Sequence, residues 1–163
     1  MTAIANVHDI GGFSGASRLL LSEQAGTWND NGNSVDTIPQ GAQQLGSGLV
    51  ILEALTNVAG GDTCTVGLVV QDAPDNGAGA PGVFANVNAN VLMTAADLAD
   101  GLPAVPTLSL DAATPEGQFT FTLPLHRLRR HVRVQTTVTQ SNAARTCNIG
   151  LELVSGGNVL VPV

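Results

Sequence analysis

A run of basic side chains, HRLRRHVR at residues 126–133, is the part of this sequence best suited to binding chemistry. It holds four of the six basic residues of the chain, all arginine, and two of its three histidines. In an extended strand alternate side chains share a face, so the odd-numbered residues from 127 to 133 would form a cationic stripe opposite Val132 and Val134. The candidate protein-contact residues are Arg127, Arg129, Arg130, His131 and Arg133.

This stripe has two interpretations. It could meet an acidic surface on another protein, because charge complementarity sets register and partner choice. Alternatively, the arginines could pair across the sheet with the thirteen acidic residues of the same domain, and exposed pairs of that kind stabilise a fold little.

The other candidates for catalysis or metal binding lack the spacing that such sites need. His126 and His131 have opposite parity in a strand, whereas a cupin-type metal site requires histidines and a glutamate that converge. Cys64 and Cys147 lie far apart in sequence without a CxxC motif, so we expect two small, buried, free thiols. No Gly-x-Ser-x-Gly elbow is present. We therefore expect no catalytic residue, no bound metal and no cofactor.

Charge and composition limit the partners. The net charge is −7, lysine is absent, and 44% of the residues are hydrophobic against 12% charged. Such a chain is expected to be globular and to be repelled by nucleic acid and anionic membranes. No apolar run approaches the roughly 20 residues of a membrane span, and the first residues do not resemble a secretory signal. We expect synthesis in a cytoplasm.

Turn residues recur between short apolar runs, which is typical of a sandwich or barrel. Period-two alternation, the mark of a half-buried strand, is clearest in four segments. These are TCTVGLVVQ at 63–71, GQFTFTLPL at 117–125, HVRVQTTVT at 131–139 and TCNIGLELV at 146–154. Further strands are predicted at 18–22, 34–38, 48–56, 91–94 and 107–110, and one helical turn at 94–101.

The pattern predicts an all-β, antiparallel two-sheet jelly-roll sandwich with at most one short helix. Residues 1–16 are predicted to be a flexible arm and 17–163 the sandwich domain. The stretch EQAGTWNDNGNS at 23–34 is expected to be a loop. Its Trp28 is one of few aromatic residues available as a platform for sugar.

Several segments resemble the jelly-roll cement (decoration) proteins of tailed-bacteriophage capsids. RLLLSEQAG is similar to the family's Leu-Phe-Ser-Asp-Ala-Gln opening, and SVDTIP to its Val-Ile-Asp strand. FTLPLHRLRRHVRVQTTVT resembles its pattern of Leu-Pro, an arginine pair and alternating aliphatic residues, although His131 replaces the usual aromatic. TCNIGLELV is similar to the closing strand.

The resemblance implies a non-enzymatic virion protein on the outer capsid surface, assembled in the host cytoplasm. Its implied partners are the major capsid protein, whose subunits it would bridge, and itself as a homodimer or homotrimer. A ligand-binding sandwich, lectin-like or from a tail receptor-binding protein, is the alternative.

Overall fold

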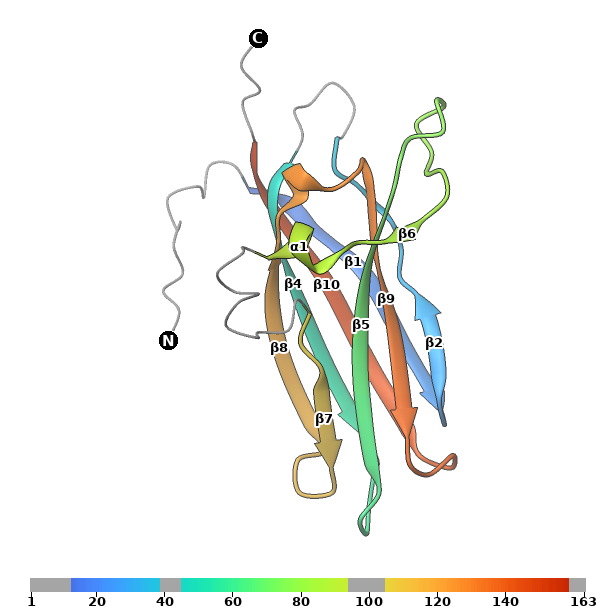
Figure 1. Ribbon diagram of the computed structural model, residues 1–163. Coiled ribbons are helices and arrows are strands. Elements are labelled where there is room, and N and C mark those ends of the chain that lie inside the picture. Colours follow the sequence, from blue (N-terminus) through green and yellow to red (C-terminus); the bar gives the residue numbers. More distant parts are fainter. Residues whose placement is uncertain (1–12, 39–44, 94–104, 159–163) are drawn as a thin grey trace.

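The computed structural model describes residues 13–38, 45–93 and 105–158 of the chain (Figure 1). Nearly all of the regular structure is β-strand. The strands are β1 (Phe13–Ala25), β2 (Trp28–Asn31), β3 (Val35–Asp36), β4 (Leu45–Thr56), β5 (Thr63–Ala73), β6 (Ala85–Asn86), β7 (Leu108–Asp111), β8 (Glu116–Leu123), β9 (His131–Gln140) and β10 (Thr146–Asn158). The described residues also form two short helices, α1 (Ala89–Leu92) and the 3-10 helix η2 (Leu125–Arg127).

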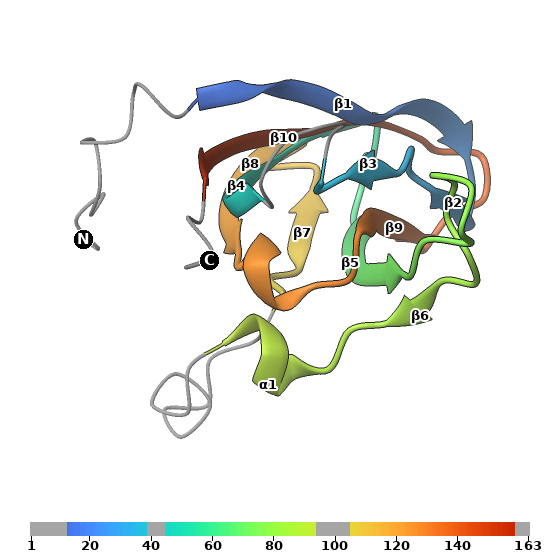
Figure 2. The same ribbon diagram turned by 90° about the horizontal axis from the view of Figure 1, so that it is seen from above.

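The strands form two antiparallel sheets. The first sheet has the order β1-β10-β4-β8, and the second has the order β2-β9-β5-β6, with β3 also paired to β9 and β7 to β5. Seen from above, the two sheets lie as facing layers (Figure 2). The all-β sandwich expected from the sequence is confirmed.

The pairing is nested along the chain. β1 pairs with β10, β2 with β9, β4 with β8, and β5 with β7. This arrangement is that of one long hairpin rolled into a sandwich, in which the paired strands alternate between the two sheets, and it is the topology of a jelly roll.

The core consists of the inward-facing side chains of both sheets. In β4 the buried residues alternate as Val50, Leu52 and Ala54, and in β10 the side chains of Ile149 and Leu151 are almost completely inaccessible to solvent. Such residues account for the period-two alternation, because the sheets bury one face each and leave the other to solvent.

The first strand begins earlier than expected. β1 starts at Phe13, within the segment predicted to be an arm, because this part of the chain pairs with β10 from Phe13 opposite Gly156 onward. Residues 1–12, which make up the rest of that predicted arm, lie outside the described residues.

Two local predictions are wrong. Residues 28–31 form strand β2 rather than a loop, because Gly26, at φ +71°, turns the chain and places Trp28 opposite Val138 with its ring buried. Within the expected strand at 91–94, Val91 and Leu92 instead form the end of α1 and pack against the core, and residue 94 lies outside the described residues. The predicted helical turn at 94–101 lies outside the described residues.

Candidate functional site

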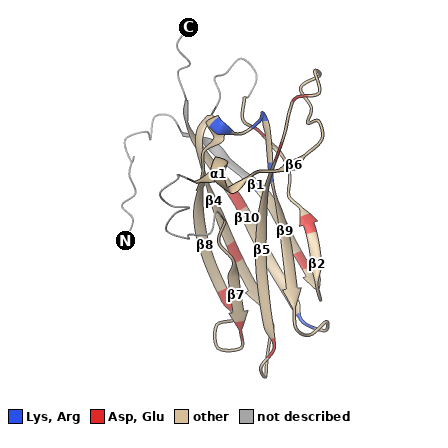
Figure 3. Ribbon diagram, viewed as in Figure 1, with Lys and Arg blue, Asp and Glu red and all other residues tan. Residues whose placement is uncertain are grey.

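The basic segment 126–133 is split between two elements. Arg127 belongs to η2, and β9 begins only at His131. Strand parity therefore does not extend back to Arg127 and Arg129, and the prediction of one continuous cationic stripe is wrong. In Figure 3 the basic residues near η2 and the start of β9 appear as separate patches at one end of the sandwich.

Arg130 is held by two carboxylates of its own chain. Its guanidinium donates two hydrogen bonds to Asp36, at 3.0 Å from Nε to Oδ1 and 2.9 Å from the second terminal nitrogen to Oδ2, and it also forms an ion pair with Asp75. Burial alone would raise the pKa of Asp36, but the hydrogen bonds from Arg130 and from the backbone N–H of Ile38 outweigh it and hold that pKa below its ordinary value. Arg130 thus fastens β3 and the loop after β5 to the start of β9.

Two further arginines also have partners within the domain. The backbone N–H of Arg129 donates to the carboxylate of Asp72 at 2.9 Å, and its Nε lies 3.8 Å from the other carboxylate oxygen. Arg133 donates from Nε to Gln71 at 2.8 Å, and its guanidinium carbon lies 4.1 Å from the centre of the Phe84 ring. Pairing within the domain therefore accounts for Arg129, Arg130 and Arg133. A contact role for any of the five candidate residues stays a prediction.

His131 is a core residue rather than part of a surface stripe. Its side chain is 3% exposed, it stands opposite Asp36 in the register of β3 and β9, and its Nε2 has no hydrogen-bond partner. His126 lies elsewhere, with Nδ1 at 2.8 Å from the carbonyl oxygen of Gly46. Within the described residues no group of three His, Cys, Asp or Glu is placed to hold a metal ion.

The two cysteines are buried free thiols, as expected. Cys64 of the second sheet and Cys147 of the first meet in the core, where the hydrogen bond that the Cys147 thiol donates to Cys64, together with burial, raises the pKa of Cys147. Trp28 is also buried, so it is not the exposed platform that sugar binding would need.

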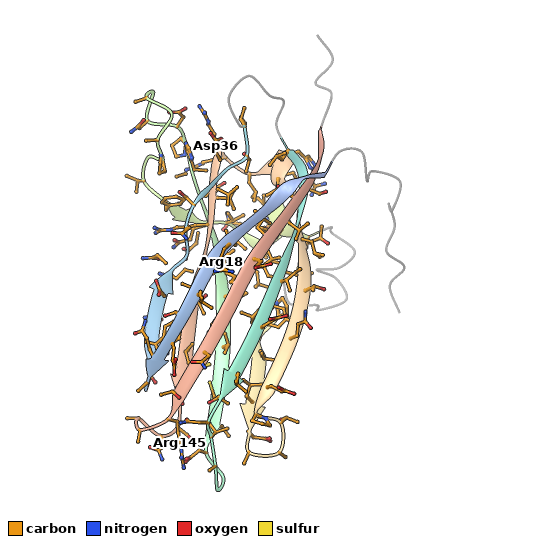
Figure 4. The ribbon with its side chains drawn as sticks, turned by 180° about the vertical axis from the view of Figure 1, so that it is seen from behind. Arg18, Asp36 and Arg145 are labelled. Carbon is orange, nitrogen blue, oxygen red and sulfur yellow. The ribbon has the colours of Figure 1, made fainter. Side chains whose placement is uncertain are left out.

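The outer face of the first sheet has the features that the sequence reasoning missed. Of the four most exposed large hydrophobic side chains among the described residues, three lie here: Leu21 (71% exposed), Leu55 (49%) and Leu49 (39%). Figure 4 views the molecule from this side, with Arg18 labelled on β1. Leu21 and Leu55 line one hollow, described below, whereas Leu49 stands six residues from Leu55 along β4, about 20 Å away.

All four glutamates of the sequence project from the same face. They are Glu23 on β1, Glu53 on β4, Glu116 on β8 and Glu152 on β10. We call this surface the glutamate face, and it comprises the outward-facing side chains of 18–23, 49–55, 116–120 and 148–152. Arg18 is its single basic residue, so its formal charge is 1 − 4 = −3.

The register of the strands fixes how these residues neighbour one another. Glu53 stands opposite Gly150 of β10 on one side and Gln118 of β8 on the other. Glu152 and Glu116 are therefore its diagonal neighbours, about 7–8 Å away. None of the four glutamates forms an ion pair within the described part of the chain.

A hollow lies over the centre of this face. It has a volume of about 610 Å³ and is lined by residues that include Leu21, Leu55, Glu53, Glu116 and Gly150. A second hollow of about 310 Å³ adjoins it and shares Leu21, Glu53 and Gly150 with the first. Gly150 forms part of the floor, since a Cβ added there would meet nothing within 4 Å.

A signal for this face was present in the sequence. The β4 segment LVILEALT is apolar at both parities, through Leu49, Ile51 and Leu55 as well as through its core residues. A strand that is apolar on both sides is typical of one covered on both faces. No described element of this chain pairs with or covers the outer side of β4.

Comparisons with known proteins give distant structural similarities alone. No family model matches the chain, and no curated protein matches it. The exported protein XepA of PBSX is similar at 14% identity and a TM-score of 0.48, over 98% of this chain and 43% of that one, so this chain spans less than half of its length. An equine rhinitis A virus capsid structure matches at 11% identity and a TM-score of 0.35, over 93% and 78% of the two chains. Latent PorU from Porphyromonas gingivalis matches at 11% sequence identity and a TM-score of 0.30, over 91% of this chain and 14% of that one.

Among the described residues no helix has the length and apolar character needed to cross a membrane.

Proposed function

We propose that this chain is a decoration (cement) protein, which binds the outer surface of a tailed-bacteriophage capsid and stabilises contacts between major capsid subunits. The observation that carries the proposal is the glutamate face, where exposed leucines and glutamates without ion-pair partners share one side of a sheet. Leu21 and Leu55 line one hollow together with Glu53 and Glu116, and exposed apolar surface with a polar rim is typical of a surface that contacts another protein.

The segments that resemble the cement-protein family support the specific role. RLLLSEQAG begins in β1, SVDTIP includes β3, FTLPLHRLRRHVRVQTTVT runs from the end of β8 through η2 into β9, and TCNIGLELV lies in β10. They thus lie on paired strands, β1 with β10 and β3 with β9, of a jelly roll. The proposed role is structural and requires no catalytic residue and no cofactor.

The proposed partners are the major capsid protein and further copies of this chain, as a dimer or trimer. Shells of the phage that carries this gene, prepared without the protein, provide the test. Purified protein is titrated onto the shells, and bound protein is measured after sedimentation, with light scattering for the oligomeric state. We expect saturable binding with a fixed number of copies per shell and greater resistance of the shells to heat.

A second candidate function is a ligand-binding module, lectin-like or from a tail receptor-binding protein. It is favoured by the hollow of about 610 Å³ over Gly150, which is within the size range of small-molecule sites. Binding to glycans without binding to shells would support this alternative and contradict the decoration role.

A further inference from the structure

We propose that the glutamate face is the docking surface of this protein, and that its partner presents an aliphatic ridge flanked by lysine or arginine side chains. This inference rests on the decoration role proposed above and adds to it the face that binds and the chemistry of the partner. The proposed contact surface is thus the acidic face of the first sheet, and not the basic segment 126–133 that the sequence suggested.

The ion pairs of the described residues involve aspartates and no glutamate. Aspartates Asp36, Asp62 and Asp75 accept hydrogen bonds or ion pairs from arginines of their own domain. Asp111 accepts hydrogen bonds from the backbone N–H groups of Ala113 and Thr114, and so shapes a turn. The four glutamates make no ion pair with any described residue. The charges of Glu23, Glu53 and Glu116 are therefore available to a partner outside the chain, while Glu152 stands opposite Arg18 in the register of β1 and β10.

The placement of Glu53 is unfavourable for the isolated domain. It has like-charged Glu152 and Glu116 on its two diagonals, about 7–8 Å away, and each of them repels it weakly, although Arg18 opposite Glu152 offsets part of this repulsion. A cation from a partner, placed among the three carboxylates, would convert this repulsion into attraction. Sites where local stability is sacrificed in this way are typically functional.

The apolar component of the face has a shape that a protruding side chain fits. Leu21 and Leu55 line the hollow, and Gly150 leaves its floor open. The face extends about 20 Å along the strands and about 15–20 Å across the four of them, which is an area on the order of 300–400 Å². That is the size of the well-packed centre of a standard interface, which buries about 800 Å² of each partner.

Charge also distinguishes between the possible occupants. A second copy docked through the same face would set −3 against −3, so self-association through it is disfavoured. Nucleic acid and anionic lipid carry the same sign as the face and are repelled as well. A basic protein surface is the occupant that satisfies both the leucines and the glutamates.

Two substitutions, each with a matched control on the second sheet, test the inference with the same shells. Gly150→Gln fills the hollow without a change of charge, and Gly67→Gln makes the same change on β5, where a Cβ would meet a single backbone oxygen at 3.9 Å. Glu53→Gln removes one negative charge, and Thr139→Lys, at an exposed position of β9, changes the net charge by the same amount.

We expect Gly150→Gln to weaken binding to shells by about tenfold or more, and Glu53→Gln to weaken it severalfold at low salt and less at high salt. The two controls should bind like the wild-type protein. Circular dichroism and urea unfolding would verify that all four variants are folded.

The outcomes separate this inference from the proposed function. If the wild-type protein does not bind shells, the decoration role fails. If the wild-type protein binds and both face variants bind as tightly as it does, the decoration role stands but the glutamate face is not the docking surface. If the face variants change the oligomeric state in light scattering, the occupant is a second copy, which also overturns the inference.

Discussion

Replacing Glu53 with glutamine is expected to stabilise the isolated protein. At about 7.5 Å in water, each of its two diagonal glutamates repels it by about 0.5 kcal/mol. The two together contribute about 1 kcal/mol before screening. With a Debye length of about 30 Å at 0.01 M salt most of this remains, and with about 8 Å at 0.15 M less than half does. Arg18, two strands away at about 12 Å, attracts Glu53 by about 0.3 kcal/mol, and this attraction is lost as well. Glu53→Gln should therefore raise the free energy of unfolding by about 0.5 kcal/mol at low salt, and by less as salt is added.

Urea unfolding provides the assay, because the single tryptophan, Trp28, is buried and its fluorescence reports on the folded core. Glu23→Gln is the matched control. Glu23 stands opposite Asn148, with Thr146 and Gly150 on its diagonals, so its removal relieves no close repulsion. A Glu53→Gln variant that is no more stable than Glu23→Gln at low salt, or whose stabilisation does not change with salt, would show that Glu152 and Glu116 do not repel Glu53 measurably.

Three other expectations follow from the core and the ion pairs. Gly48→Ala should destabilise by about 1–3 kcal/mol in urea unfolding, since its Cβ would lie 2.6 Å from a leucine methyl group. Gly150→Ala should leave the free energy of unfolding unchanged or raise it. Equal losses of stability in Gly48→Ala and Gly150→Ala would contradict the difference in packing between the two positions. Arg130→Gln should move the acid-unfolding midpoint to higher pH. The lowered pKa of Asp36 gives stability that is present above about pH 4 and lost as the pH falls through the folded-state value, and an unchanged midpoint would exclude this. A thiol reagent should modify neither cysteine until urea unfolds the protein, and rapid labelling of the native state would contradict their burial.

The fold could be predicted from the sequence wherever a strand buries one face. The segments around Val66, Phe121, Val134 and Leu151 have one mainly apolar parity, and all four lie in long strands of the sandwich. Strand β2 could not be found in this way. Its sequence, WNDN, has low strand propensity, and it is extended because Trp28 fills the core and the chain pairs with β9.

The candidate site was harder to predict, because the sequence shows where charged residues are but not whether they pair within the domain. The arginines of 126–133 are close together in sequence and therefore indicated a binding surface. Arg130, however, forms ion pairs with Asp36 and Asp75, which lie 94 and 55 residues away in the sequence. The four glutamates are scattered along the chain, and only the register of four strands brings them to one face. Such a surface is a property of the topology, and local sequence patterns do not contain it.

A cryo-electron microscopy map of shells decorated with this protein would show directly which sheet faces the capsid. We expect the first sheet to face the shell, with lysine or arginine side chains of the capsid subunits within ion-pair distance of Glu53 and Glu152 and an apolar side chain over Gly150. A map in which this face is turned to solvent, with the contact made instead through η2 and the start of β9, would contradict this expectation.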